Sequence, residues 1–213
     1  MSAAAYIPNF NGEKWLPRTL QSLRGQTRRP DVVVVDNGST DGSIAAARAD
    51  FPEATVLELG ENIGFGPALN RAVAAHPAEA IVLLNSDVEC EPGFCEALLA
   101  GADGVEMVAG VLLQEQAPDL IDSAGVVADR TLMGFDYLHG ERAGAAAGAA
   151  APLGPTGGGG LYRRDAWEAV GGFDERIFLY YEDLDLALRL AHGIVTFQEQ
   201  LIGSFVRTMR RPP

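Results

Sequence analysis

Residues 31–37 read DVVVVDN, and this run constrains the fold more than any other feature of the sequence. Four consecutive valines leave no polar face, which is typical of a strand buried on both sides within a parallel sheet. Parallel sheets of this kind carry helices on both faces. The flanking sequence should therefore supply strands that alternate with helices.

The first half of the chain shows that alternation. Strands are predicted at residues 3–8, 31–37, 54–60 and 80–88, and helices at 13–25, 42–50, 67–75 and 92–101. The helices are indicated by apolar residues at helical spacing or by residues typical of a helix start, and short links join the elements. This pattern predicts an open, mostly parallel α/β sheet.

From about residue 105 the rhythm changes. We expect one strand over 105–113, shorter strands at 122–130 and 193–198, and a short helix at 165–172. Residues 143–151 (AGAAAGAAA) have no clear apolar face and are interpreted as a mobile loop rather than a helix. Because no repeat or linker interrupts the chain, residues 1–213 are predicted to form a single domain whose second half elaborates the sheet.

Composition limits the partners. Hydrophobic residues make up 47% of the chain and charged residues 21%, as in a globular protein. The formal net charge is −13, and Lys14 is the only lysine, so binding to bulk nucleic acid is not expected. An acidic protein that handles an anionic small molecule needs a metal ion or backbone amides to offset the repulsion.

The two cysteines, Cys90 and Cys95, give no metal or disulfide signal. Two ligands do not make a zinc site, and the three histidines lie far away in sequence. We interpret the cysteines as reduced thiols of a cytoplasmic protein.

A signal peptide or membrane span is not expected either. The N-terminus lacks a basic region, and no apolar run approaches the ~18 residues of a membrane helix. The basic tail, with Arg207, Arg210 and Arg211, leaves a peripheral membrane contact open.

Polar residues follow each of the four predicted parallel strands, at 8–11, 36–38, 61–64 and 85–87. Any one of these groups alone is typical of a turn. In open α/β sheets, however, ligands bind beyond the carboxyl ends of the strands. Four polar ends at one edge therefore favour a binding site.

The last of these groups, Asn85-Ser86-Asp87, offers hard oxygen ligands. Asn85 and Asp87 suit Mg²⁺ or Mn²⁺, ions that substrate phosphates and waters usually complete. Asp36 could accept hydrogen bonds from a base or a ribose. Phe10 could lie flat against a base, although a core position is the more ordinary reading of that residue by itself.

An acid-rich run, YYEDLDLALRL, occupies residues 180–190. Acids at a helix start commonly cap free amides and offset the helix dipole. Asp185 is spaced to pair with Arg189 one helical turn later and is interpreted as structural. For Glu182 and Asp183 the local pattern leaves both a cap and a catalytic role open.

Six segments carry a resemblance to a known family. They are IPNFNG, VVDNGSTDGS, ENIGFGPALNRA, LLNSDVECEPGF, GGGGLYRRDAWEAVGGFDE and FLYYEDLDLALRL, in this order. Together they resemble the signature segments of family-2 glycosyltransferases, most closely the bacterial rhamnosyltransferase-like branch, over roughly residues 4–200. The resemblance implies a single GT-A-type α/β domain. Such a domain has a Rossmann-like, mostly parallel open sheet flanked by helices and a smaller mixed acceptor-side part.

The resemblance also implies an activity. Family members of this kind move a sugar, with inversion, from a nucleotide-diphosphate donor to an acceptor hydroxyl, often in cell-surface polysaccharide or glycolipid synthesis. The donor would be a UDP- or dTDP-sugar, and the acceptor a glycan or a lipid-linked glycan. Residues 1–103 would form the nucleotide-sugar-binding half, and residues 104–213 the acceptor and catalytic half.

Site residues carry over by position. The resemblance places donor binding at Pro8, Phe10, Asn11, Asp36, Asn62, Gly64, Asn70, Asn85, Ser86 and Asp87. Asp87 and Asn85 would hold a divalent metal, Mg²⁺ or Mn²⁺, although the first Asp of the family's metal motif is here Asn85. Glu182 and Asp183 match the catalytic acid pair, with Asp183 the general base. Gly158 and Gly159, in a run of four glycines, would let a sugar or acceptor approach closely.

The sequence departs from the family pattern near its end. Many relatives complete the metal site with a histidine there, whereas LIGSFVRT, residues 201–208, contains none. Relatives often continue with further helices beyond this point. A catalytically silent nucleotide-sugar or glycan binding module is therefore the alternative. A nucleotidyltransferase is less favoured, because IPNFNGEKW is a poor phosphate loop.

Overall fold

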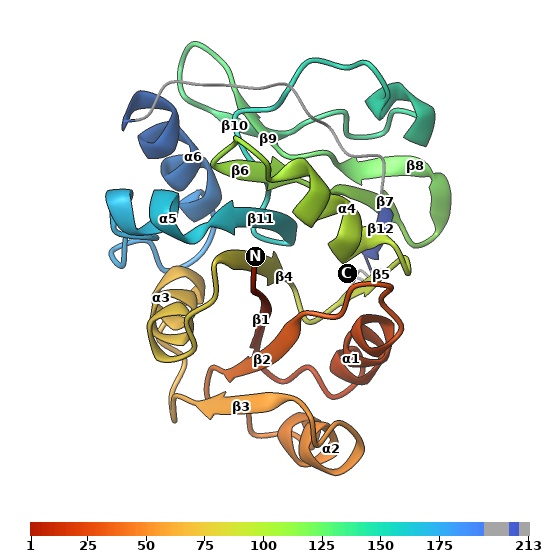
Figure 1. The fold of residues 1–213 in the computed structure, drawn as a ribbon, viewed down its shortest axis with the longest axis vertical. Helices are drawn as coiled ribbons and strands as arrows, with labels where there is room; N and C mark the ends of the chain where they lie inside the picture. Colours follow the sequence, from red (N-terminus) through yellow and green to blue (C-terminus); the bar gives the residue numbers. More distant parts are fainter. Residues whose placement is uncertain (194–204, 209–213) are drawn as a thin grey trace.

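A six-stranded sheet in the order β3-β2-β1-β4-β11-β6 runs through the computed structural model of the chain (Figure 1), which describes residues 1–193 and 205–208. The sheet is built from β1 (Ala3–Asn9), β2 (Asp31–Asp36), β3 (Thr55–Glu58), β4 (Ala80–Leu84), β6 (Met107–Ala109) and β11 (Gly159–Arg163). The first four of these are parallel, whereas β11 runs antiparallel to β4 and to β6. The expected mostly parallel open sheet is confirmed.

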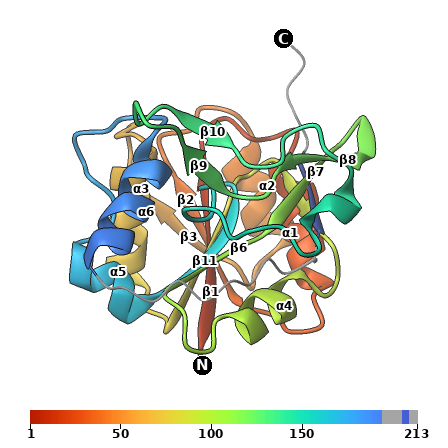
Figure 2. The same ribbon diagram turned by 90° about the horizontal axis from the view of Figure 1, so that it is seen from above.

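Helices cover both faces of this sheet (Figure 2). One face packs α1 (Leu16–Arg24), α2 (Ser43–Asp50) and α4 (Phe94–Gly101), and the other packs α3 (Phe65–Ala75), α5 (Arg164–Val170) and α6 (Glu182–Gly193). Successive side chains of β1 alternate between the two cores: Ile7 joins the first and Tyr6 the second, both fully buried. Because both faces are buried, the run at residues 31–37 has no need of a polar face.

Two small sheets lie beside the large one. Their strands are β5 (Val88–Cys90), β7 (Val111–Gln114), β8 (Ala117–Ser123) and β12 (Phe205–Thr208) in one sheet, and β9 (Val126–Ala128) with β10 (Gly134–Asp136) in the other. The four-stranded sheet has the order β5-β12-β7-β8 and mixes parallel and antiparallel pairs. This is the smaller mixed part that was expected.

The prediction of one strand over residues 105–113 is wrong. The chain bends at Gly110, so that β6 joins the large sheet and β7 the four-stranded one. A Cβ at Gly110 would lie 2.7 Å from the Phe94 ring and 2.8 Å from the carbonyl oxygen of Gly159. Only glycine fits this close approach, and the backbone N–H of Gly110 donates to that same carbonyl at 3.0 Å. The bend directs the second half of the chain over the edge of the sheet.

Other expectations for the second half are met in part. The predicted short helix corresponds to α5, and residues 122–130 contain the end of β8 and all of β9. The alanine-rich segment 143–151 is irregular except for one 3-10 turn at Ala143–Ala146. The strand predicted at 193–198 lies outside the described residues, except for Gly193 at the end of α6.

Cys90 and Cys95 are free and buried. Burial raises the pKa of the Cys95 thiol to about 12, as expected for an inert structural cysteine. Within the part of the chain that the structure describes, no helix has the length and apolar character needed to cross a membrane. The side chains of Arg207, Arg210 and Arg211 fall outside that part.

Candidate active site

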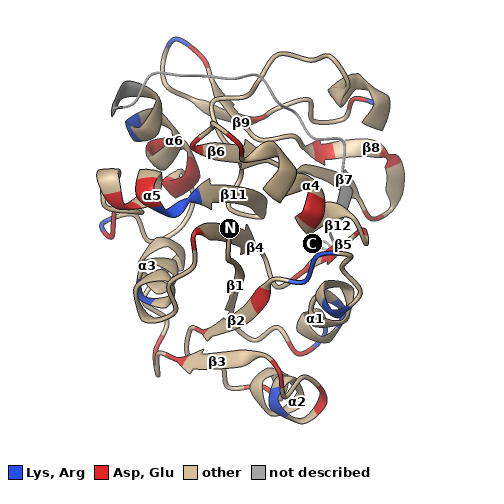
Figure 3. Cartoon of the chain, viewed as in Figure 1, with Lys and Arg blue, Asp and Glu red and all other residues tan. Residues whose placement is uncertain are grey.

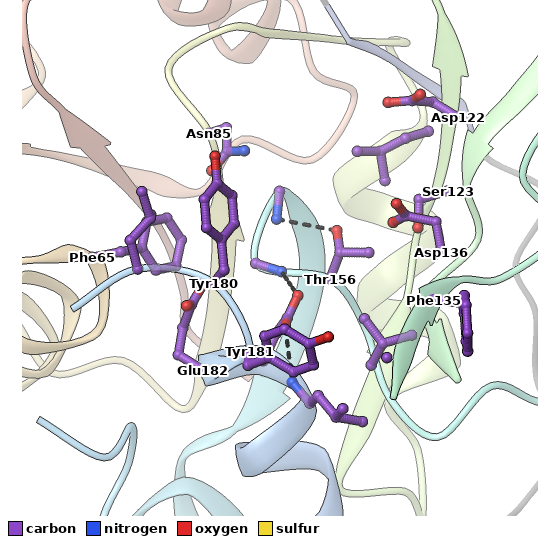
Figure 4. A pocket seen from close by; sticks show the side chains of 18 of the residues that line it. Phe65, Asn85, Asp122, Ser123, Phe135, Asp136, Thr156, Tyr180, Tyr181 and Glu182 are labelled. Atoms are coloured by element: carbon purple, nitrogen blue, oxygen red, sulfur yellow. Dashed lines mark hydrogen bonds between the residues drawn. The ribbon is translucent and has the colours of Figure 1, made fainter. Parts of the chain in front are cut away.

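A pocket of about 1070 Å³ opens beyond the carboxyl end of β4 (Figure 4). Its wall comes from the segment after β4, the glycine run before β11, the start of α6, and strands β8 and β10. Figure 4 shows Asp122, Ser123 and Asp136 on one side of this space and Asn85 and Glu182 on the other. Five of the predicted site residues line it, namely Asn85, Asp87, Gly158, Glu182 and Asp183.

Asn85 and Asp87 enter the pocket because β4 ends at Leu84 and the chain then leaves the sheet. The backbone N–H of Asn85 donates to the carbonyl oxygen of Gly158 at 3.4 Å, and the carbonyl oxygen of Ser86 accepts from the Thr19 hydroxyl at 2.9 Å. The backbone is thus fixed on both sides of the turn. The half-buried side chains of Asn85 and Asp87 remain on the pocket wall.

The same two side chains meet the requirements of a substrate-completed metal ion. The described residues hold no cluster of three or more His, Cys, Asp or Glu side chains that could bind a metal by themselves. One carboxylate and one amide oxygen are hard ligands, which suit Mg²⁺ or Mn²⁺ when donor phosphates and waters complete the coordination. The donor set therefore fits an ion that binds together with its nucleotide.

Asp183 is held at the first turn of α6 by two backbone amides. Its Oδ1 accepts from Leu184 N at 2.7 Å, and its Oδ2 accepts from Gly157 N at 3.3 Å. Burial raises the pKa of Asp183, whereas these two hydrogen bonds lower it and the charge of Asp136 raises it further. The carboxylate is therefore oriented and desolvated, as a general base must be.

Glu182 lies deeper, with a 6% exposed fraction. Its Oε2 is buried and has no hydrogen-bond partner within the described structure. Burial raises the pKa of Glu182 from 4.5 to about 7, and the neighbouring charge of Asp183 adds to the shift. An orphaned buried carboxyl oxygen on a pocket wall is expected where a ligand supplies the missing partner.

The backbone before α6 is strained. Tyr180 and Tyr181 have φ of 67° and 68°, in the left-handed region that non-glycine residues seldom adopt. Consecutive residues of this kind cluster at functional sites. Here they turn the chain sharply, so that Glu182 and Asp183 reach the pocket while Asp185 continues the helix.

The interpretation of Asp185 as structural agrees with its contacts. Its Oδ2 accepts from Arg189 Nη2 at 2.6 Å, one turn along α6, and Arg189 Nη1 also donates to the carbonyl oxygen of Val170 at 2.8 Å. The acid-rich run thus divides into a helix-stabilising acid and two pocket acids.

The glycine run lets Asp183 approach the sheet. A Cβ at Gly157 would lie 2.9 Å from the Phe65 ring, and one at Gly158 would lie 3.1 Å from Asn85 Nδ2. A side chain at Gly157 would therefore displace either the ring or the N–H that holds Asp183. Gly159 is already part of β11, opposite Leu84, and does not line the pocket.

The ends of the first three strands form a second polar group, which we call the strand-end network. At its centre Asn37, 5% exposed, donates through Nδ2 to Asn62 Oδ1 at 2.9 Å and to the Gly64 carbonyl at 3.1 Å. Its Oδ1 accepts from Ile63 N at 2.9 Å. Asp36 Oδ1 accepts from Ser39 N at 3.0 Å. The expected gathering of polar residues at one sheet edge is confirmed, although many of them bond to one another.

The predicted donor residues outside the pocket lining are Pro8, Phe10, Asn11, Asp36, Asn62, Gly64, Asn70 and Ser86. Phe10 is 44% exposed rather than a core aromatic, so its ring is accessible. Asn70 lies on α3 and clasps the backbone of Phe173, donating from Nδ2 and accepting at Oδ1, both at 2.9 Å. Donor contact by these residues stays a prediction.

The pocket also contains residues that the sequence did not single out. Phe65, Asp122, Ser123, Asp136, His139 and Thr156 all line it. His139 Nδ1 is bonded to the Asp122 carbonyl oxygen at 2.7 Å, which ties the chain after β10 to the end of β8. No short-range pattern marks these residues, because they meet only when the β8–β10 segment folds over the sheet.

Comparison with known sequences gives a family match. The sequence model of glycosyl transferase family 2 matches residues 5–170. An N-acetylglucosaminyl-diphospho-decaprenol L-rhamnosyltransferase of Mycobacterium tuberculosis (strain ATCC 25618 / H37Rv) is 33% identical over 201 residues, covering 82% of this chain and 66% of that protein. The chain thus spans just under two thirds of that relative's length.

Solved structures match at lower identity. Mannosyltransferase PcManGT from Pyrobaculum calidifontis, in complex with GDP-Man and Mn²⁺, gives a TM-score of 0.69 at 20% identity over 97% of this chain and 56% of its own. S. aureus TarS 1–349, in complex with UDP, gives a TM-score of 0.64 at 17% identity over 99% of this chain and 59% of its own. These likenesses confirm the expected GT-A-type fold.

Proposed function

The chain belongs to glycosyl transferase family 2, and from that premise we propose that it transfers a sugar, with inversion, from a nucleotide-diphosphate donor to an acceptor hydroxyl. The observation that carries this proposal is the meeting of Asn85 and Asp87 with Glu182 and Asp183 in one pocket. Hard oxygen ligands for a diphosphate-bound ion and a desolvated carboxylate are the two parts that such a transfer requires.

Asp183 is the proposed general base. Inverting transfer needs a carboxylate opposite the leaving diphosphate, within hydrogen-bond reach of the acceptor hydroxyl. Two backbone amides fix both oxygens of Asp183 in place. As the sugar centre becomes electron-poor, the carboxylate removes the hydroxyl proton, and the acceptor oxygen forms the new bond while the bond to the diphosphate breaks.

Asp87 and Asn85 are the proposed metal ligands. A Mg²⁺ or Mn²⁺ ion bound there would stabilise the negative charge of the departing diphosphate. PcManGT contains Mn²⁺ together with GDP-Man, which supports a divalent ion here. The ion would also solve the electrostatic problem of a chain with a net charge of −13 that binds an anionic donor.

The donor class follows from the same reasoning. We propose a UDP- or dTDP-sugar, with its nucleoside over the strand-end network, near Pro8, Phe10 and Asp36. TarS 1–349 was solved with UDP, which supports a pyrimidine nucleotide. The exposed Phe10 ring offers a surface for the base.

For the acceptor, we propose a glycan or lipid-linked glycan of cell-surface polysaccharide or glycolipid synthesis. The mycobacterial relative is named as an N-acetylglucosaminyl-diphospho-decaprenol L-rhamnosyltransferase, and this name supports a lipid-linked acceptor. The enzyme would then work in the cytoplasm, at the inner face of the plasma membrane.

A silent binding module is the second candidate, favoured by the absence of histidine from residues 201–208. A thermal-shift screen of UDP-, dTDP- and GDP-sugars with and without Mn²⁺ identifies a donor, because a ligand of the native state raises the melting temperature. The donor found is then assayed for slow hydrolysis and for transfer. Metal-dependent binding with turnover supports the enzyme. Binding without any hydrolysis supports the silent module, and no binding by any nucleotide sugar contradicts both.

A further inference from the structure

We propose that Asp122, Ser123, Asp136 and His139, which we call the acceptor wall, bind an uncharged sugar ring of the acceptor and hold its hydroxyls between Asp136 and Asp183. The inference rests on the proposed function and specifies the acceptor class for the same pocket. It excludes acceptors whose reacting sugar ring carries a carboxylate.

The charge of the pocket supports an uncharged ligand. Five carboxylates line it (Asp87, Asp122, Asp136, Glu182 and Asp183), and its lining includes no Lys or Arg among the described residues. Figure 3 shows acidic residues on α6 and β8, the elements that carry two of its walls. A metal ion bound with the donor would offset the negative charge only on the side of the pocket where Asp87 lies. On the opposite side an anionic sugar would meet like charges, whereas sugar hydroxyls can donate hydrogen bonds to the carboxylates.

Glu182 gives an independent indication of a ligand. Its side chain is more than nine-tenths buried and lines the pocket, yet its Oε2 has no hydrogen-bond partner within the described structure. Buried polar atoms are nearly always satisfied, so a partner is expected from outside the chain. A sugar hydroxyl meets that requirement, because it can either donate to a carboxylate or accept from a carboxyl group.

The position of the acceptor wall places a sugar next to the base. Asp136 ends β10, where it pairs with Val126 of β9, so its backbone is fixed by a ladder rather than by a free loop. Asp136 is close enough for its charge to act on Asp183. A ring between them can present one hydroxyl to Asp183 for reaction and another to Asp136 for orientation.

Aromatic side chains at the mouth complete a carbohydrate-type site. Phe135, Tyr180 and Tyr181 line the pocket with exposed fractions of 52%, 73% and 48%. Of the nine large hydrophobic side chains that are exposed in the described structure, seven lie within residues 132–135 and 178–181. The two segments contact each other, since the Tyr181 hydroxyl lies 3.1 Å from Met133 Sδ. A pyranose ring has one C–H-rich face, which packs on aromatic rings, and a hydroxyl edge, which the carboxylates can bind.

The test compares ligands that differ only in charge. Saturation-transfer NMR on the whole chain measures binding of the methyl glycosides of glucose, N-acetylglucosamine, mannose and rhamnose, together with methyl glucuronide. We expect at least one neutral glycoside to bind, and the glucuronide to bind about tenfold more weakly than methyl glucoside or not at all. Asp136→Asn should weaken neutral binding about tenfold and reduce the discrimination against the glucuronide.

Asp119→Asn is the matched control, because Asp119 is an exposed acid of the same strand as Asp122 and lies outside the pocket lining. It should leave both affinities unchanged. Equal binding of glucoside and glucuronide, no binding by any glycoside, or an unchanged Asp136→Asn variant would each overturn the acceptor wall. Nucleotide-sugar binding, measured separately by thermal shift, distinguishes these failures from a failure of the proposed function.

Discussion

The strand-end network and the pocket are both polar, yet their polar groups are used differently. In the network, Asn37 donates two hydrogen bonds and accepts one, all within the chain. In the pocket, as far as the described residues show, Glu182 keeps an unsatisfied carboxyl oxygen, and Asp183 accepts hydrogen bonds from backbone amides alone. The network therefore stabilises the edge of the sheet, whereas the pocket leaves interactions for a ligand to make.

The contrast separates stability from activity. Substitution of Asn37, at the centre of the network, should lower the free energy of unfolding and change turnover little, and substitutions in the pocket should do the reverse. Natural sites commonly sacrifice stability in this way, because desolvated and unsatisfied groups cost folding free energy. One exception already lies on the network side: Asn9 Oδ1 is buried and has no partner among the described residues, although its Nδ2 donates to Ser39 and Ser43.

The largest effect is expected for Asp183→Asn. The amide cannot accept the acceptor's proton, so turnover should fall by about a thousandfold, while the donor dissociation constant should stay within about threefold. Single-turnover transfer and calorimetric donor titration measure the two quantities. Asp185→Asn is the control on the same helix and should cost less than about threefold in turnover. Near-wild-type turnover of Asp183→Asn would refute the base assignment.

Asp87→Ala should come second. Loss of the only carboxylate in Asn85-Ser86-Asp87 should weaken nucleotide-diphosphate binding in Mn²⁺ by about tenfold to a hundredfold and leave metal-free binding unchanged. Calorimetry with UDP, with Mn²⁺ and with chelator, makes the comparison. Glu89→Gln, an exposed partner of Arg18 just beyond the pocket, is the control. Identical metal dependence in wild type and Asp87→Ala would remove the metal role.

Asn37→Ala tests the network side. It leaves the Ile63 N–H without its partner and removes one of the two hydrogen bonds that the Gly64 carbonyl accepts, which should cost about 2 kcal/mol in the free energy of unfolding. Urea denaturation gives the value, and Gln116→Ala in an exposed turn should change it by less than about 0.5 kcal/mol. Turnover well below the melting point should remain within a few-fold. A stable but inactive Asn37→Ala variant would contradict the stabilising role of the strand-end network and would indicate a role for Asn37 in activity.

The last prediction concerns the pH dependence of stability and leaves activity aside. Because burial raises the pKa of Glu182 from 4.5 to about 7, folding favours its protonated form. Its contribution is fully present below about pH 4.5 and is lost as the pH rises through about 7. Glu182→Gln keeps the side chain neutral, so it should exceed wild type by about 1 kcal/mol at pH 5 and by about 3 kcal/mol at pH 8.

Urea denaturation of Glu182→Gln at pH 5 and pH 8 measures this difference, with the exposed Glu61→Gln as the control. The same gain at both pH values would point to packing rather than ionisation. A gain at pH 5 alone would contradict the sign of the pKa shift.

Much of the fold of the first half could be predicted, because each strand and helix there has its own short-range sequence pattern. The four valines of β2 and the continuous apolar run of β1 are short-range signals, and the carboxyl ends of parallel strands must share an edge. The structural role of Asp185 could also be distinguished from that of Asp183, since Asp185 lies one helical turn before Arg189 and is spaced to pair with it. The catalytic role proposed for Asp183, by contrast, rests on the family resemblance rather than on the local pattern.

The features that the sequence did not predict depend on contacts between segments far apart in the chain. Phe94 and Gly159 crowd the position of Gly110, and within 105–113 only that glycine itself hints at a break in the strand. Asp136 and His139 reach the pocket only because β10 pairs with β9 and the chain returns to β8. Asn37 looked like an ordinary turn residue, because its three partners come from residues 62–64.

The short backbone tie at residues 157–158 has a consequence for how such an enzyme can diversify. Gly157 N holds Asp183, and one residue later the Gly158 carbonyl binds Asn85 N, directly before β11 pairs with β4. The spacing between Asp183, the proposed base, and Asn85, a proposed metal ligand, is thus set by the pairing of β11 with β4. Segments around the mouth can be exchanged to accept other sugars while that spacing stays constant. The segments that select the sugar can therefore change in evolution without moving the residues proposed to carry out the transfer.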